Sequence, residues 1–122
     1  MNFKILERVA ASLKTGGKFI LTTLNALYAL THSLIEFMPE AQELHFDELT
    51  LYEHSICKKV DDDGNTELIK CVERFYMPSE IRWYLKSLGF KTVEIFGCPL
   101  GKWDRNIPLT RDEFEMLVVS QK

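Results

Sequence analysis

The hydrophobic residues near the start of the chain follow two different periods. Across residues 3–13 they recur every three or four positions, which predicts an amphipathic helix. Gly16 and Gly17 follow, and glycine readily takes the left-handed conformation that ends a helix. Residues 18–24 are a nearly continuous apolar and β-branched run, which is typical of a strand covered on both faces. A helix followed so closely by such a strand indicates an α/β layered fold.

The segment after this first strand returns to helical spacing. Leucines at three- and four-residue intervals lie on one face of a helix predicted over residues 26–38, and Pro39 ends it. Residues 39–48 are polar, and we expect them to form a loop.

A β-hairpin is predicted in the middle of the chain. Residues 49–60 and 66–76 alternate loosely on either side of the sequence DDDGN at 61–65, which is strong turn chemistry. Asp and Asn side chains at alternate positions, as in this turn, are also found in calcium-binding loops. A calcium loop of that type needs Gly at its sixth position and Glu at its twelfth, where this chain has Thr66 and Val72. We therefore interpret the acidic run as a solvated turn.

The last third of the chain predicts one more helix and two strands. A Pro-Ser pair suits the first turn of a helix over residues 78–88, and Gly89 suits its C-terminal cap. Strands are expected over residues 91–97 and 113–120. The connection between them, residues 98–112, is long, and long loops without regular structure are often functional.

Composition adds a few constraints. With 46% hydrophobic and 27% charged residues, we expect residues 1–122 to form a single globular domain. A net charge of −3 gives no general attraction to nucleic acid or to an anionic membrane. The sequence has neither a signal-peptide pattern nor an apolar run of roughly 18 residues, so a cytoplasmic location is expected. The three cysteines and three histidines lack metal-ligand spacing, so no metal site is expected.

The motifs at the junctions of these elements resemble those of one enzyme family. The sequence LKTGG at 13–17 matches a turn into a strand, and residues 80–81 with 88–90 match a helix-to-strand passage. Residues 114–122 match an antiparallel final strand. In this order they resemble the C-terminal half of a class I S-adenosylmethionine-dependent methyltransferase. The resemblance implies an α/β, partial Rossmann-like fold: a mixed sheet with an antiparallel last strand, plus a β-hairpin inserted at about residues 49–76.

The resemblance also implies a reaction, which is methyl transfer from S-adenosylmethionine to an acceptor that the sequence does not identify. The family's glycine-rich cofactor loop would stand upstream of Met1, so we expect no cofactor-binding residue here and no activity from this chain alone. Gly16 and Gly17 are no substitute, because they precede a strand, whereas nucleotide cradles follow a strand and open a helix.

Candidate substrate residues follow from topology, since ligands of open α/β sheets bind beyond the carboxyl ends of the parallel strands. The end of the first strand and the loop at 98–112 are expected to meet at that edge. The resemblance implies that the exit of the hairpin, residues 74–76, forms a lid over the same region, as inserts do in relatives. The predicted substrate-binding residues are Asn25, Tyr28, Arg74, Tyr76, Trp103 and Arg105. No catalytic base is assigned, because a base is needed only when the acceptor must lose a proton.

Each of these residues also has a structural alternative. Asn25 is suited to cap the helix that follows it. Arg74 is suited to pair with Glu53 or Glu73 on a solvated face of the hairpin. The aromatic residues are suited to packing in the core or at its edge.

Three hypotheses result. In the first, the chain is the substrate-side portion of a methyltransferase and is inactive alone. In the second, it is a non-catalytic interaction module of the same fold, whose strand at 18–24 pairs through an exposed edge with a second copy or with a separate cofactor-binding half. In the third, it is an unrelated α+β ligand-binding domain, for which the sheet order would separate residues 18–24 from 113–120.

Overall fold

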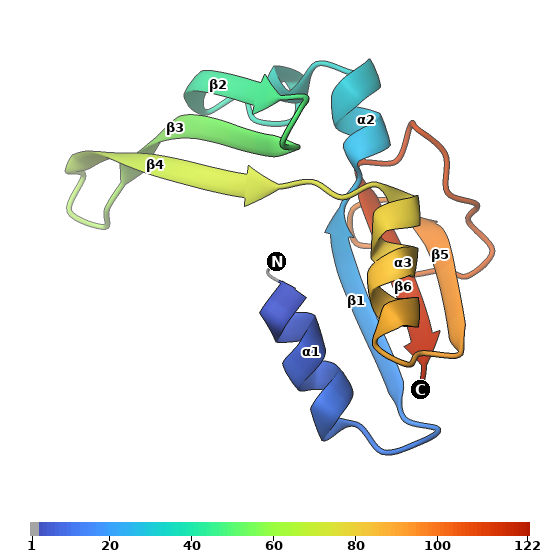
Figure 1. The fold of residues 1–122 in the computed structure, drawn as a ribbon. Helices are drawn as coiled ribbons and strands as arrows, with labels where there is room; N and C mark the ends of the chain where they lie inside the picture. The colour runs from blue at the N-terminus through green and yellow to red at the C-terminus, as the bar shows by residue number, and fades with distance from the viewer. Residues whose placement is uncertain (1–2) are drawn as a thin grey trace.

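A computed structural model describes residues 3–122 and contains two three-stranded sheets (Figure 1). In chain order the elements are α1 (Phe3–Ser12), β1 (Lys18–Leu24), α2 (Ala26–Thr31), the 3₁₀ helix η1 (Leu34–Glu36), β2 (Ala41–Asp47), β3 (Tyr52–Val60), β4 (Thr66–Arg74), α3 (Pro78–Ser87), β5 (Thr92–Cys98) and β6 (Glu115–Gln121). We call β1, β6 and β5 together with α1 and α3 the body, and we call β2, β3 and β4 the arm. Figure 1 shows the arm projecting sideways from one end of the body.

In the body sheet, β6 lies between β1 and β5 and runs antiparallel to both. The register places Leu117 of β6 between Thr22 of β1 and Phe96 of β5. The antiparallel last strand is therefore confirmed, and β1 and β6 are neighbours, unlike the order expected of an unrelated α+β domain. Because β6 separates the two strands that run in the same direction, both ladders of this sheet are antiparallel. The mixed sheet that we expected is not formed within residues 3–122.

The core of the body lies between this sheet and the helices α1 and α3, which pack on the same face (Figure 1). Its buried residues are Leu6, Ala10, Tyr76, Ile81, Leu85, Phe90, Val93, Met116 and Val118. On the opposite face of β1, Ile20 is 58% exposed. The prediction of a strand covered on both faces is therefore wrong, because both helices cover one face only.

The arm is an antiparallel sheet in the order β2-β3-β4. The strand β2 corrects our expectation of a loop at residues 39–48. Leu44 and Phe46 of this strand pack against a second hydrophobic cluster, which includes Phe75, while its intervening side chains are polar. A register irregularity between Ala41 and Glu43 interrupts the alternation of this strand. That irregularity, together with the polar composition, hides the strand period in the sequence.

The helix predicted over residues 26–38 is also shorter than expected. The helix α2 ends at Thr31, whose hydroxyl donates to the carbonyl oxygen of Leu27 at 2.7 Å. His32 then takes an extended conformation while its N–H donates to the carbonyl of Tyr28. Such bonds satisfy the last carbonyls of a helix, so the chain leaves it and resumes as the short helix η1.

The remaining elements lie close to the predicted ranges. The helix α3 begins at Pro78, and Gly89 with a φ of +94° follows its end. The turn between β3 and β4 is closed by Asp61, whose carboxylate accepts the N–H groups of Asp63 and Asn65 at 3.0 and 2.7 Å. Among the described residues, no helix combines the length and apolarity needed to cross a membrane.

Candidate functional site

Asn25 is buried at the carboxyl end of β1, where it joins two separate segments of the chain. Its Oδ1 accepts the N–H of Leu27 at 3.1 Å, which caps α2 and confirms the capping alternative. Its Nδ2 donates to the carbonyl oxygens of Thr110 at 3.1 Å and Glu113 at 2.8 Å. Both amide protons are used within the protein, so this side chain holds the end of the β5–β6 loop against α2.

A pocket of about 250 Å³ lies at the same edge of the sheet, beyond the carboxyl end of β5. It is lined by Phe37 and by residues 98–100 and 112–114, and we call it the rim pocket. Phe37 and Phe114 stack with their ring centroids 4.5 Å apart and their planes within 9°. Tyr28 is buried and meets both rings edge-on, at 5.2 and 5.4 Å. Tyr28 therefore supports the aromatic wall of this pocket.

The surroundings of Tyr28 are acidic. Burial raises the pKa of Tyr28, and the negative charges of Glu36 and Asp112 raise it further. The ring of His32 stacks on Tyr28 with the centroids 4.1 Å apart, and its Nε2 lies 3.1 Å from Oδ1 of Asp112. The phenol therefore stays protonated at neutral pH, and the side chain acts here as a packing group.

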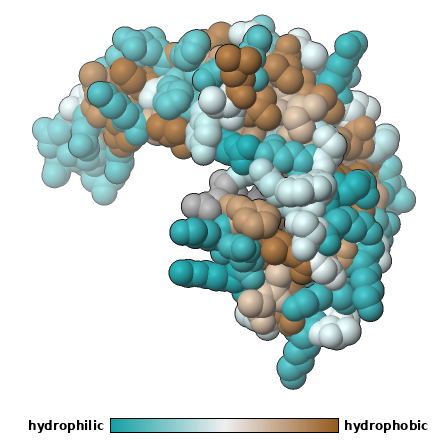
Figure 2. All heavy atoms as spheres, in the orientation of Figure 1, coloured by the Kyte–Doolittle hydropathy of each residue, from teal (hydrophilic) through white to brown (hydrophobic). Residues whose placement is uncertain are grey.

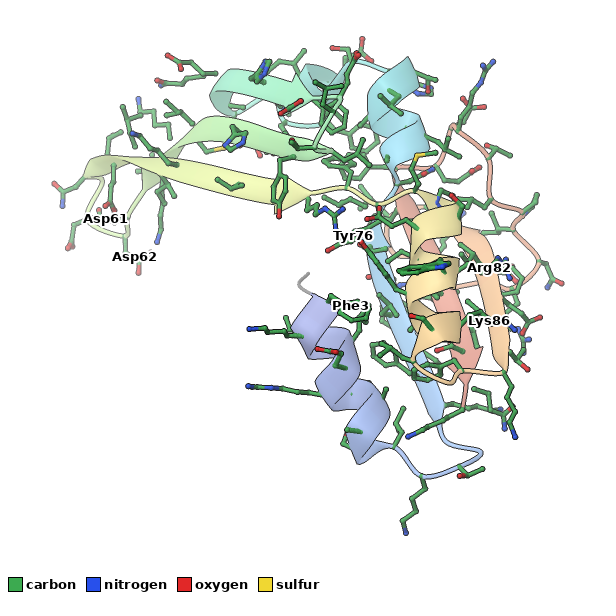
Figure 3. All side chains as sticks on the ribbon, viewed as in Figure 1. Phe3, Asp61, Asp62, Tyr76, Arg82 and Lys86 are labelled. Carbon is green, nitrogen blue, oxygen red and sulfur yellow. The ribbon has the colours of Figure 1, made fainter. Side chains whose placement is uncertain are left out.

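A second group of polar side chains lies where the arm joins α3. Arg74 donates from Nη2 to Oε1 of Glu80 at 2.5 Å, and the Tyr84 hydroxyl donates to the same oxygen at 2.8 Å. The Arg74 guanidinium also lies over the ring of Tyr76, 4.4 Å from its centroid. We call Arg74, Tyr76, Glu80 and Tyr84 the junction cluster, and Figure 3 shows Tyr76 at this junction. Arg74 thus pairs with Glu80 of α3 and not with Glu53 or Glu73, the partners that the sequence offered.

Burial and hydrogen bonds shift the pKa values of three side chains in the junction cluster. Partial burial by itself would lower the pKa of Arg74, but the hydrogen bonds and the negative charge around it outweigh burial and raise the pKa. Burial raises the pKa of Tyr76, and the hydrogen bond to Glu80 raises that of Tyr84. At neutral pH Arg74 therefore stays charged, and the phenols of Tyr76 and Tyr84 stay neutral.

The two groups of residues are adjacent through the backbone. Tyr76 donates its N–H to the carbonyl of Leu24 and accepts the N–H of Ala26, both at 3.0 Å. These bonds form a parallel bridge between Tyr76 and Asn25. The exit of the hairpin therefore lies beside the end of β1, in the region where the resemblance placed it.

Trp103 and Arg105 lie elsewhere. Trp103 is 76% exposed on the β5–β6 loop. Arg105 folds back along the sheet, where its Nη2 lies 2.6 Å from Oε2 of Glu94 and its guanidinium lies 5.7 Å from the ring centroid of Phe96. Arg105 therefore does not join the other predicted residues at the rim.

The Gly16–Gly17 turn does not form a phosphate or nucleotide cradle. The N–H of Gly16 donates to the carbonyl of Lys122 at 2.7 Å, and the N–H of Gly17 donates to that of Lys14 at 2.8 Å. Both donors are consumed by the fold, so these residues do not fit the binding of a nucleoside cofactor. Residues 3–122 also hold no group of three or more His, Cys, Asp or Glu side chains placed to ligate a metal.

Sequence reasoning missed Glu80, Tyr84, Phe37 and Glu113. A local signal was present for the first pair, because Glu80 and Tyr84 are four residues apart on a predicted helix and so share a face. Phe37 and Glu113 carry no such signal, because they meet only through tertiary contacts between distant parts of the chain.

Solved structures with a similar fold include two enzymes. The CcbJ methyltransferase from Streptomyces caelestis has a TM-score of 0.68 and 15% identity, over 98% of this chain and 52% of that one. An S-adenosylmethionine-dependent methyltransferase from Clostridium acetobutylicum ATCC 824 has a TM-score of 0.59 and 14% identity, over 98% and 50%. No family model matches the chain, and no curated protein matches it significantly. The chain spans about half the length of both enzymes, and its fold is methyltransferase-like.

Proposed function

We propose that this chain is the substrate-side, C-terminal portion of an S-adenosylmethionine-dependent methyltransferase, with the arm as an insert in a partial Rossmann-like domain. The observation that carries the proposal is the match of 98% of the chain to about half of each of two such enzymes. The methyl acceptor is unidentified, and the chain is inactive alone.

The part assigned to this chain is to bind and orient the acceptor, because the N–H groups of its Gly16–Gly17 turn are used within the fold and do not fit a cofactor cradle. Alignment of the reacting groups and exclusion of water supply much of the rate in group transfer. Asn25 and Tyr28 support the rim pocket from behind. Arg74 and Tyr76 close the neighbouring junction, while Trp103 and Arg105 are assigned to the outer part of the loop.

The test is calorimetric titration with S-adenosylhomocysteine of two samples. One is the isolated chain, and the other is the complex that a tagged copy retains when it is purified from its own cells. We expect saturable binding by the complex and none by the isolated, folded chain. Binding by the monomeric chain would contradict its inactivity, and absence of binding in both samples would contradict methyl transfer.

The second candidate is an interaction module that pairs through the edge of β1. Among the described residues, β1 has a ladder with β6 only, and Tyr76 bridges the end of its other edge at Leu24 and Ala26. The rest of that edge, along residues 18–23, has no described strand beside it and can accept another strand. A second copy or a separate cofactor-binding half is the proposed partner.

Edge pairing is tested by sedimentation mass at increasing concentration. Ile20→Lys places a charge on the open face of this edge strand and is expected to weaken association. Val60→Lys, at an equally exposed position of the arm, is the matched control. A strictly monomeric wild type would argue against this candidate.

A further inference from the structure

The rim pocket has one rigid aromatic wall. Phe37 and Phe114 stack against each other, and the buried ring of Tyr28 meets both edge-on from behind. Leu100 and Pro99 add further apolar lining. A volume of about 250 Å³ is enough for a body the size of one aromatic ring and a short chain.

The acidic side of the pocket is held in place by the fold. Oε2 of Glu113 accepts both the N–H and the hydroxyl of Thr110, at 2.5 and 2.7 Å. The Glu113 side chain also packs over Gly97, where a Cβ atom would lie only 2.8 Å from its Cγ. Oε1 accepts no hydrogen bond from any described residue. Glu113 is thus a pocket-lining residue whose carboxylate is held through Oε2.

Asp112 is a second carboxylate in the pocket lining, and it is held less firmly than Glu113. Its Oδ1 lies 3.1 Å from Nε2 of His32, and its other oxygen has no partner among residues 3–122. Its side chain is 70% exposed, so its charge is well screened by solvent. The lining contains no lysine or arginine, so the two carboxylates face no cation within the pocket wall.

We propose that the rim pocket binds an amine: a small molecule whose apolar or aromatic body packs on Phe114 and Phe37 and whose ammonium group donates to Oε1 of Glu113. A fixed carboxylate beside an apolar wall favours a cation with an apolar body over a neutral or anionic analogue. As the acceptor class of the enzyme, the amine rests on the proposed function, whereas its binding to this chain does not. As acceptor, its ammonium group first loses a proton to water, because only the neutral nitrogen has the lone pair that attacks the methyl group.

The test is a titration of the ¹⁵N-labelled chain followed by NMR, with 2-phenylethylamine as the probe. The neutral 2-phenylethanol and the anionic 3-phenylpropionate serve as matched ligands. We expect the amine to shift the amides of Leu100, Glu113 and Phe114 and to bind about tenfold more tightly than the alcohol. Glu113→Gln is expected to remove that preference and to leave binding of the alcohol unchanged.

Glu67→Gln, the same charge change at an exposed position of the arm, is the control and should leave amine binding unchanged. If Glu113→Gln loses the dispersed spectrum of a folded protein, Asp112→Asn replaces it, with a loss of amine affinity of up to about fivefold. Equal affinity for amine and alcohol, shifts confined to other residues, or equal losses from Glu67→Gln would overturn the proposal.

The titration contains no cofactor, so its result is independent of the proposed function. Failure of amine binding, with S-adenosylhomocysteine binding by the complex, would leave methyl transfer to another class of acceptor. Amine binding without any S-adenosylhomocysteine binding would leave an amine-binding module that is not a methyltransferase.

Discussion

The body and the arm are both three-stranded sheets, but they are stabilised differently. In the body, two helices bury one face of the sheet, and Met116 and Val118 at its centre are fully buried. In the arm, Leu68 and Val72 of β4 are each more than half exposed. Figure 2 shows the arm extending away from the bulk of the molecule, over a hollow beside α1.

The difference indicates that the body is stabilised mainly by hydrophobic burial. Much of the stability of the arm comes from backbone pairing and from the polar junction cluster. Burial of apolar surface contributes roughly 25 cal/mol per Å², so the element with little burial must rely on its hydrogen-bond ladders and turns. Those contributions are individually small.

The largest effect is expected from truncation in the body. Leu85→Ala removes a fully buried side chain of α3 and should lower the free energy of unfolding by about 3 kcal/mol. Trp83→Ala, at an exposed position of the same helix, should change it by less than about 0.5 kcal/mol. Urea denaturation measures both. Similar values for the two variants would mean that the body is not held by this core.

A smaller effect of opposite sign is expected in the arm. Glu53 on β3 is fully buried, and neither of its carboxylate oxygens has a hydrogen-bond partner among the described residues. Burial raises the pKa of Glu53 above its ordinary value of 4.5 and outweighs the opposing effects of Ser55 and His54, and the charge of Glu73 adds to the shift. Glu53→Met should therefore increase the free energy of unfolding at pH 7 by about 1 kcal/mol or more.

The direction of the pKa shift of Glu53 determines how its effect on stability changes with pH. A raised pKa in the folded state means that folding favours the protonated form of Glu53. The contribution of this group to stability is therefore complete below pH 4.5 and is lost as the pH rises through the folded-state pKa. The advantage of Glu53→Met should grow over that range, whereas the exposed Glu67→Gln should show no such trend. A variant less stable than wild type at pH 7 would contradict the assignment of a buried, unpaired carboxylate.

The smallest effect is expected at the junction between the two regions. A double-mutant cycle of Arg74→Gln and Glu80→Gln should give a coupling of about 1 kcal/mol, because both side chains are largely buried. The Arg105–Glu94 pair is the control: its side chains are 61% and 43% exposed, and its coupling should be below about 0.5 kcal/mol. Equal couplings would mean that the junction adds nothing beyond a surface ion pair.

The body was more predictable from the sequence than the arm. Its elements have strong local patterns, such as the helical spacing of residues 3–13 and the Gly89 cap after α3. In the arm, β2 is polar and carries a register irregularity, so its pairing with β3 decides the strand and its own period does not. The end of α2 at Thr31 depends on side-chain bonds that hydrophobic periodicity does not record.

The candidate site was predictable only in part. Topology placed Asn25 at the carboxyl end of β1, and the resemblance to methyltransferases placed the exit of the hairpin over the same region, where Tyr76 bridges Asn25. The partner of Arg74 and the fold-back of Arg105 depend on side-chain geometry, as does the position of Glu113 over Gly97. Such contacts join residues far apart in the chain, and no spacing in the sequence encodes them.

The central position of β6 has a consequence for the order of folding. The Ser120 hydroxyl donates to the carbonyl of Phe19, a residue 101 positions earlier, so the body sheet depends on contacts of very long sequence separation. During synthesis, β1 and β5 have no ladder partner in the body until residues 115–121 emerge, while the arm is built from consecutive strands and can form first. Until β6 inserts, the apolar faces of β1 and β5 are exposed together, and this interval is when the nascent chain is most open to aggregation or to chaperone binding.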